Sequence, residues 1–236
     1  MNTKFFLPGT DQQQKILLSN IDVKGFTILV IGSGSEEIAE RFISENASKI
    51  TLITDDDNSL FKARLQLSNV REINIKLMEF DNTDFANSYF DLIYAQASIS
   101  NKKRAKIINE VKRILKPGGY FCVGENVSLT KSPPQFVDDV WKSSNIFPLF
   151  ADELKKYYEE KGFKVIHEHD LSKTLTDFYT QSSILLKEKA DILSDQEKSF
   201  YKKMLKQISH ESNVYLKLGG NAHIGFKTLI LKKGLS

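Results

Sequence analysis

Cysteine is almost absent from this chain, and that scarcity excludes several protein classes. The 236 residues include one cysteine, Cys122, so no disulfide framework and no cysteine-based metal site can form. No apolar run approaches the roughly 20 residues of a membrane span. Residues 1–9 lack the charged start, apolar stretch and small-residue cleavage site of a signal peptide. We therefore expect a cytoplasmic protein with no membrane span.

An excess of charge of either sign is also missing. Lys and Arg number 33 and Asp and Glu number 30, which gives a net charge of +3. The one basic cluster, 102–104, is interpreted as the solvated start of a helix, so no nucleic-acid partner is expected. The length fits a single domain over residues 1–236.

Apolar runs and helical patterns alternate along the first half of the chain. Continuous apolar strands between amphipathic helices favour an α/β fold, with a parallel sheet covered on both faces. Strands are expected at Ile28–Ile31, Lys49–Thr54, Ile73–Met78, Phe90–Ala95 and Tyr120–Gly124, and helices at Glu36–Ser44, from a cap at Asn58 or Ser59 through Ser68, and at Asn101–Leu115.

The last third has a different pattern. A helix at Asp152–Lys161 and a strand at Phe163–His169 precede a stretch, 172–218, that is expected to form two helices. A strand over His223–Leu231 follows. The helical insertion 172–218 should therefore lie at one edge of the fold and reach over a ligand cleft as a cap.

The most informative segment is the strand-to-helix turn at residues 27–41. An apolar strand ends at Gly32, Ser33 and Gly34, and a helical pattern begins almost at once. Glycines let the backbone approach a nucleotide-like ligand, and the first turn of a helix offers free N–H groups. The structural alternative, a tight turn without a ligand, stays open because many such turns carry glycine.

Four landmarks in order resemble class I S-adenosylmethionine-dependent methyltransferases of the small-molecule, ubiquinone-biosynthesis type. They are Ile28–Ser35, Asp55–Asp57, Phe90–Ile93 and Glu110–Tyr120. The resemblance implies a Rossmann-like, doubly wound sheet of seven strands in the order 3-2-1-4-5-7-6, with the last strand antiparallel. It also implies S-adenosyl-L-methionine as the cofactor, bound over the carboxyl ends of strands one, two and four.

The same resemblance assigns site residues one by one. Gly32, Ser33 and Gly34 would pass under the methionine and ribose parts of the cofactor, an acid at Asp55 or Asp56 would accept the ribose hydroxyls, Asp81 with Asn82 beside it would meet the adenine amino group, and Tyr94 to Ala97, with Gln96 among them, would face the sulfonium and the acceptor.

Three positions depart from the family pattern. Val30 replaces an acid, Glu36 replaces the third glycine, and Thr54 stands where the ribose acid aligns. They motivate an alternative of another class: a catalytically degenerate methyltransferase fold that acts as a binding or partner subunit. For the ribose we predict that the strand ends by Thr54, so that Asp55, already in the turn, takes the role.

Methyl transfer needs a general base only if the acceptor must lose a proton. Candidate bases are Tyr94, Glu125 and His223. A small-molecule acceptor is expected between residues 125–145 and the helical insertion, with Phe5–Leu7 as a lid. No metal is expected, because His167 and His169 share a strand face without a third ligand. Whether the chain forms a homodimer or joins a partner stays open.

Overall fold

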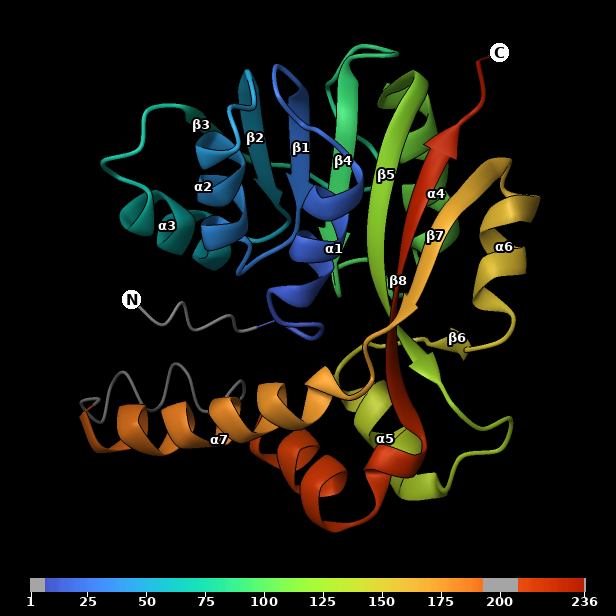
Figure 1. Cartoon of the computed structure of the whole chain (residues 1–236). Coiled ribbons are helices and arrows are strands. Elements are labelled where there is room, and N and C mark those ends of the chain that lie inside the picture. Colours follow the sequence, from blue (N-terminus) through green and yellow to red (C-terminus); the bar gives the residue numbers. More distant parts are fainter. Residues whose placement is uncertain (1–6, 193–207, 236) are drawn as a thin grey trace.

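The computed structural model describes residues 7–192 and 208–235, which form one mixed sheet with helices on both faces (Figure 1). The strand order is β3-β2-β1-β4-β5-β8-β7, and β6 pairs with the end of β5. β8 runs antiparallel to both of its neighbours, β5 and β7. The strands are β1 (Thr27–Ile31), β2 (Lys49–Thr54), β3 (Ile73–Leu77), β4 (Phe90–Gln96), β5 (Leu115–Ser128), β6 (Leu149–Phe150), β7 (Phe163–Asp170) and β8 (Ile224–Lys233).

Alternation along the strands divides the core into two layers. Leu29 of β1 packs with α4 and α6, whereas Ile28 and Val30 pack with α1, α2 and α3 on the opposite face. The helices are α1 (Gln12–Asn20), α2 (Glu36–Ser44), α3 (Asp57–Gln66), α4 (Arg104–Ile114), α5 (Gln135–Ser143), α6 (Leu154–Glu160) and α7 (Thr174–Ile192), with a short 3₁₀ turn, η1, at Gly220–Ala222.

A separate group of helices forms a cap beyond the carboxyl ends of the parallel strands. In Figure 1, α5, α7 and the helical residues 208–217 lie below the sheet, on the side toward which the parallel strands run. Trp141, Tyr179 and Val214 pack together there against Phe226 at the start of β8. We call this group of helices the cap. It covers the edge of the sheet where α/β proteins bind ligands.

The expected fold class and strand order are confirmed, with β6 as an added two-residue strand that shifts the numbering. The expected N-cap residue of α3, Asn58 or Ser59, is wrong. The N-cap is Asp56, whose carboxylate accepts a hydrogen bond from the Ser59 N–H at 2.9 Å. Residues 116–119, which lie between the expected helix Asn101–Leu115 and the expected strand Tyr120–Gly124, belong to β5, where the pairing jumps from Phe90–Leu115 to Leu92–Tyr120.

Two helices, α1 and α5, were not predicted. α1 turns the polar residues Gln13 and Gln14 into the core beside Leu17, so its buried face is only partly apolar. The expected helical insertion begins with α7, but residues 193–207 and the expected lid residues Phe5 and Phe6 lie outside the described residues. Among the residues that the structure describes, no helix is long and apolar enough to cross a membrane.

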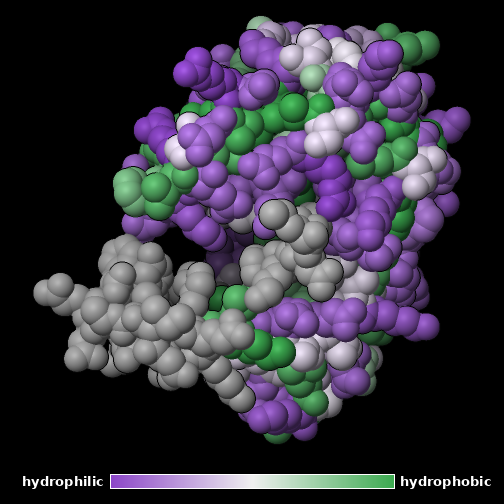
Figure 2. Space-filling model, turned by 60° about the vertical axis from the view of Figure 1, so that its left-hand side comes forward, coloured by the Kyte–Doolittle hydropathy of each residue, from purple (hydrophilic) through white to green (hydrophobic). Residues whose placement is uncertain are grey.

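The face of the molecule in Figure 2 is mostly hydrophilic where it is coloured. In Figure 2, polar side chains cover most of the visible face, with smaller apolar groups between them. Among the side chains that the structure describes, Phe61 and Leu65 of α3 are the most exposed large apolar ones in the helices, at 72% and 68%.

Candidate active site

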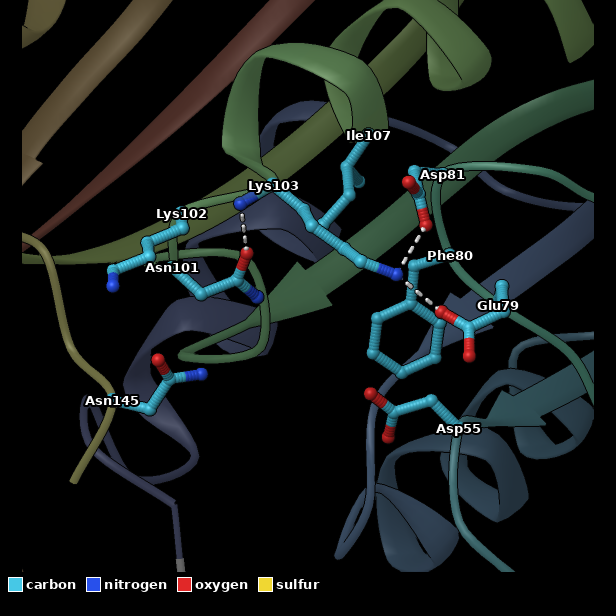
Figure 3. Close-up of a pocket in the computed structure, with 9 residues that line it drawn as sticks. All are labelled: Asp55, Glu79, Phe80, Asp81, Asn101, Lys102, Lys103, Ile107 and Asn145. Atoms are coloured by element: carbon cyan, nitrogen blue, oxygen red, sulfur yellow. Dashed lines mark hydrogen bonds and ion pairs between the residues drawn. The ribbon is translucent and has the colours of Figure 1, made fainter.

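A pocket of about 320 Å³ opens at the carboxyl ends of β2 and β3, and we call it the edge pocket. Its walls come from the end of β2, the β3–β4 connection, the start of α4 and the segment after α5. Figure 3 shows one wall made by the β2 and β3–β4 residues and the opposite wall by residues 101, 102 and 145. The lining residues are Asp55, Glu79, Phe80, Asp81, Asn101, Lys102, Lys103, Ile107 and Asn145.

Asp55 reaches the edge pocket because β2 ends one residue before it. Thr54 is the last residue of β2 and is fully buried, whereas Asp55 lies in the bend that follows. The predicted end of the strand is therefore confirmed, and the side chain is freed from the strand's alternation. Partial burial raises the pKa of Asp55, and the neighbouring carboxylates Asp56 and Glu79 add to that effect.

Asp81 and Glu79 share one cation in the pocket. The Lys103 Nζ lies 3.1 Å from Asp81 Oδ1 and 2.5 Å from Glu79 Oε2 (Figure 3). These hydrogen bonds raise the pKa of the Lys103 ammonium. Lys103 contacts Oδ1 of Asp81, which leaves Oδ2 of this carboxylate for a ligand.

The glycine turn lies beside the edge pocket and does not line it. Gly32 has φ 121° and donates its N–H to Ile53 O of β2, so the turn and the end of β2 are neighbours. A Cβ at Gly32 would lie 2.6 Å from Ser98 Cβ, so this glycine is needed for packing. A Cβ at Gly34, where φ is 81°, would make an ordinary van der Waals contact with Leu7, at 3.5 Å, and would meet no other side chain of the described residues.

Buried oxygens without partners surround this turn. Among the described residues, Ser35 Oγ and Glu36 Oε1 have no hydrogen-bond partner, although Ser35 is fully buried and Glu36 is 3% exposed. Ser33 is exposed. A buried polar group without a partner costs free energy. The two oxygens are therefore acceptors that a ligand with several donors would satisfy.

Gln96 and Tyr94 hold the N-terminal segment in place. The Tyr94 hydroxyl donates to Gln96 Oε1 at 2.6 Å, and Gln96 Nε2 donates to Pro8 O and Thr10 O at 2.7 and 2.8 Å. Burial raises the pKa of Tyr94 well above its usual value. Neither side chain lines the edge pocket.

Glu125 belongs to a buried ion pair. It is fully buried, and its two oxygens lie 3.0 and 3.1 Å from Arg104 Nε. The hydroxyls of Ser100 and Tyr158 donate to it, each at 2.6 Å. Its lone pairs are therefore committed to protein donors, and its place does not support the role of a general base.

Three further expected residues lie away from the pocket. His223 Nδ1 is 2.9 Å from Thr130 Oγ1, just before β8. Asp56 is committed to its helix cap, and the exposed Asn82 lies in a turn. His167 and His169 stack with centroids 6.3 Å apart, and no group of three metal-ligating side chains occurs in the part of the chain that the structure describes.

Sequence reasoning missed most of the residues that line the edge pocket. Lys103 was interpreted as part of a solvated helix start, and its ion pairs join residues 22 and 24 positions apart. Such contacts carry no local signal. Phe80 had one: it directly precedes Asp81 after a predicted strand, and its 6% exposure places the ring against the pocket.

Comparison with known proteins shows what part of this chain resembles. Residues 29–123 match the family of methyltransferase domains. The chain is also 25% identical over 169 residues to alpha N-terminal protein methyltransferase 1 of Drosophila melanogaster, covering 66% of this chain and 58% of that protein. The chain thus spans less than two thirds of that relative's length.

Solved structures show the same fold at low sequence identity. Phosphoethanolamine N-methyltransferase 2 of Haemonchus contortus, in complex with S-adenosylhomocysteine and a phosphomonomethylethanolamine, matches with a TM-score of 0.77 and 13% identity, over 99% of this chain and 55% of that one. The [4+2]-cyclase SpnF matches with a TM-score of 0.75 and 16% identity, over 96% and 81%. Residues 29–123 are thus similar to methyltransferase domains, and the sheet has the same fold as these solved structures.

Proposed function

We propose that this protein is a methyltransferase that binds S-adenosyl-L-methionine across the edge pocket and the glycine turn and methylates a small molecule. One observation carries the proposal: Asp55, Phe80 and Asp81 line a single pocket beside the glycine turn, within the matched methyltransferase domain. A carboxyl group with a raised pKa, here Asp55, in a concave site at the carboxyl edge of an α/β sheet is typical of a ligand site.

The edge pocket fits an adenosyl group. Asp55 offers two carboxylate oxygens to the two ribose hydroxyls, which suits a donor pair. The Phe80 ring gives an apolar wall for a flat base, and Asp81 Oδ2 offers an acceptor for an exocyclic amine. These are the donor and acceptor types that adenosine requires.

The glycine turn fits the amino-acid end of the cofactor. At Gly34 a Cβ would contact only Leu7 of the described residues, and among those residues Ser35 Oγ and Glu36 Oε1 have no hydrogen-bond partner. Gly32 is required by Ser98 and gives no support to a ligand. We therefore assign the close approach to Gly34.

The residues of this chain would orient the cofactor and the acceptor and exclude water from the site. The bound cofactor supplies an activated methyl group on a sulfonium. Orientation of two reactants can contribute roughly 7–11 kcal/mol to lowering a barrier. The cap lies over the same edge of the sheet and would close the acceptor side (Figure 1).

The acceptor atom should need no strong base from this chain. Tyr94 and Glu125 are fully buried and hydrogen-bonded to protein groups. An acceptor that already carries a free lone pair, such as a neutral amine, avoids the need for a proton acceptor. The expected cytoplasmic location and the question of a homodimer stay predictions.

Calorimetric titration of the full chain with S-adenosylhomocysteine tests the site. Asp55→Ala should weaken binding by about 1.5–3 kcal/mol, or roughly 10- to 150-fold, the range for hydrogen bonds to a charged group. Asp56→Ala is the matched control, because it removes the same charge one residue away but acts on the α3 cap. If Asp56→Ala weakens binding and Asp55→Ala does not, the assignment of the ribose acid is wrong.

A second candidate is a domain that binds the cofactor and transfers no methyl group. The buried, unpartnered carboxylate of Glu36 at the position of a family glycine favours it. The fold also occurs in a protein named as a [4+2]-cyclase, so fold alone does not fix the reaction. Tight binding without S-adenosylhomocysteine production, over a panel of small amines, would favour this candidate.

A further inference from the structure

Glu36 is a buried carboxylate in an unusual situation. It is the first residue of α2, two positions after Gly34, and it is 3% exposed. Its Oε1 atom has no hydrogen-bond partner, and no ion pair in residues 7–192 or 208–235 includes it. A buried carboxylate without a partner costs free energy in the folded protein. The free protein therefore carries an interaction site that nothing in the described chain uses.

The adjacent residue has the same deficiency. Ser35 is fully buried, and its Oγ also lacks a partner among the described residues. Two acceptor oxygens thus lie on consecutive residues at the end of the glycine turn. An ammonium group carries three N–H donors and a positive charge, so it can satisfy both oxygens and neutralise the carboxylate.

We propose that Glu36 is a cofactor-binding residue whose carboxylate accepts hydrogen bonds from the ammonium group of the cofactor's amino-acid end. This inference rests on the proposed function, and it adds a charged contact at a place where the family resemblance has only a glycine. The Glu36 carboxylate attracts the ammonium and repels the cofactor's own carboxylate. The site should therefore recognise the amino-acid end chiefly through its positive charge.

Three ligands separate the parts of this recognition. 5′-Methylthioadenosine carries the adenosyl part and no amino acid, S-adenosylhomocysteine carries ammonium and carboxylate, and decarboxylated S-adenosylmethionine carries the ammonium alone. Wild-type protein should bind S-adenosylhomocysteine more tightly than 5′-methylthioadenosine. Glu36→Gln should lower the affinity for S-adenosylhomocysteine by about tenfold or more, and the affinity for decarboxylated S-adenosylmethionine by at least as much. Its affinity for 5′-methylthioadenosine should stay within about twofold, which also shows that the variant is folded.

Glu40→Gln is the matched control, because it removes one negative charge from the same helix, one turn further on, at a half-buried position. It should leave all three affinities within about twofold. Glu36→Asp keeps the charge on a shorter side chain and should lose less affinity than Glu36→Gln.

The inference is overturned if Glu36→Gln binds S-adenosylhomocysteine as tightly as wild type does. It is also overturned if Glu36→Gln lowers the affinity for 5′-methylthioadenosine as much as the affinity for S-adenosylhomocysteine, since the effect would then not depend on the ammonium group. If wild type binds 5′-methylthioadenosine and S-adenosylhomocysteine, the cofactor site of the proposed function stands whatever Glu36 does. If wild type binds none of the three ligands, the proposed function itself fails.

Discussion

Two buried carboxylates in this protein have opposite surroundings. Glu125 is neutralised by Arg104 and receives hydroxyl donors, whereas Glu36 has an oxygen without any partner in the described chain. Desolvation is unfavourable for both, but only the first is compensated within the protein. A fully compensated carboxylate serves the fold, and an uncompensated one beside a ligand turn is available for binding.

Arg104→Ala should destabilise the protein by about 3–5 kcal/mol, because it leaves the Glu125 carboxylate buried without its counter-charge. Urea unfolding followed by circular dichroism measures this loss. Lys156→Ala is the control: its pair with Glu160 is 3.8 Å long and largely exposed, so the loss there should be about 0–1 kcal/mol. An Arg104→Ala protein within about 1 kcal/mol of wild type would contradict the structural role of the pair.

At the scale of elements, α4 fastens the connection that carries Asp81. Glu110 accepts hydrogen bonds from the N–H and hydroxyl of Thr83, at 2.8 and 2.5 Å. Arg113 pairs with Glu110 and donates to Phe85 O at 2.8 Å. One face of the helix therefore holds the β3–β4 connection against the edge pocket.

The state of Glu110 should make this attachment sensitive to acid. Burial alone would raise the pKa of Glu110, but hydrogen bonds from Arg113 and Thr83 outweigh it and lower the pKa from 4.5 to about 2. The ionised form is therefore favoured by folding. Its stabilisation is present above pH 4.5 and is lost as the pH falls toward about 2.

Glu110→Gln should accordingly be less stable than wild type at pH 7, and the difference should shrink as the pH falls below about 4. Urea midpoints at pH 7, 4 and 2.5 measure it. Hydrogen exchange should also quicken in residues 79–89 of the variant at pH 7. Glu160→Gln, on an exposed surface pair, serves as the control. A constant difference at all three pH values would exclude Glu110 as the titrating group.

The sequence predicted the frame of these elements well, because burial leaves a direct pattern. The apolar run Ile28–Ile31 and the amphipathic spacing after residue 101 each identified an element. The ion pair between Lys103 and Asp81 could not be predicted, because a pair of charges 22 positions apart leaves no periodic pattern in the sequence. α1 was missed because glutamines occupy its buried face: Gln13 Nε2 donates to Ala95 O at 3.0 Å, a contact that only the fold creates.

At the scale of the whole molecule, ligand binding and stability should be coupled. A ligand that binds only the folded state stabilises it by about 2.7 kcal/mol at 100 times its Kd. S-Adenosylmethionine should therefore raise the melting temperature of the full chain. Gly34→Val should abolish this shift, because the valine side chain would occupy the space beside Leu7 that we assign to the close approach of the cofactor.

Wild type and Gly34→Val must be compared by the ligand-induced shift in melting temperature, and not by the melting temperature itself. Gly34 has φ 81°, so valine there is strained and lowers stability without ligand. Gly219, with φ 81° and open surroundings, gives the matched control: Gly219→Val should lower the melting temperature and keep the shift. If the Gly34→Val protein keeps the full ligand-induced shift in melting temperature, the cofactor does not bind at this turn.

The position of β8 in the sheet also constrains how the protein can be made. β5 ends at Ser128, but its neighbour on one side is β8, which begins at Ile224. During synthesis, one edge of β5 therefore stays unpaired until residues 129–223 and then β8 have been made. β7 pairs with β8, so it cannot join the sheet before β8 is present. Unpaired strand edges invite association with other chains. A nascent chain stalled before residue 224 should thus be a preferred client for chaperones, although the strands β1 to β4 are already complete.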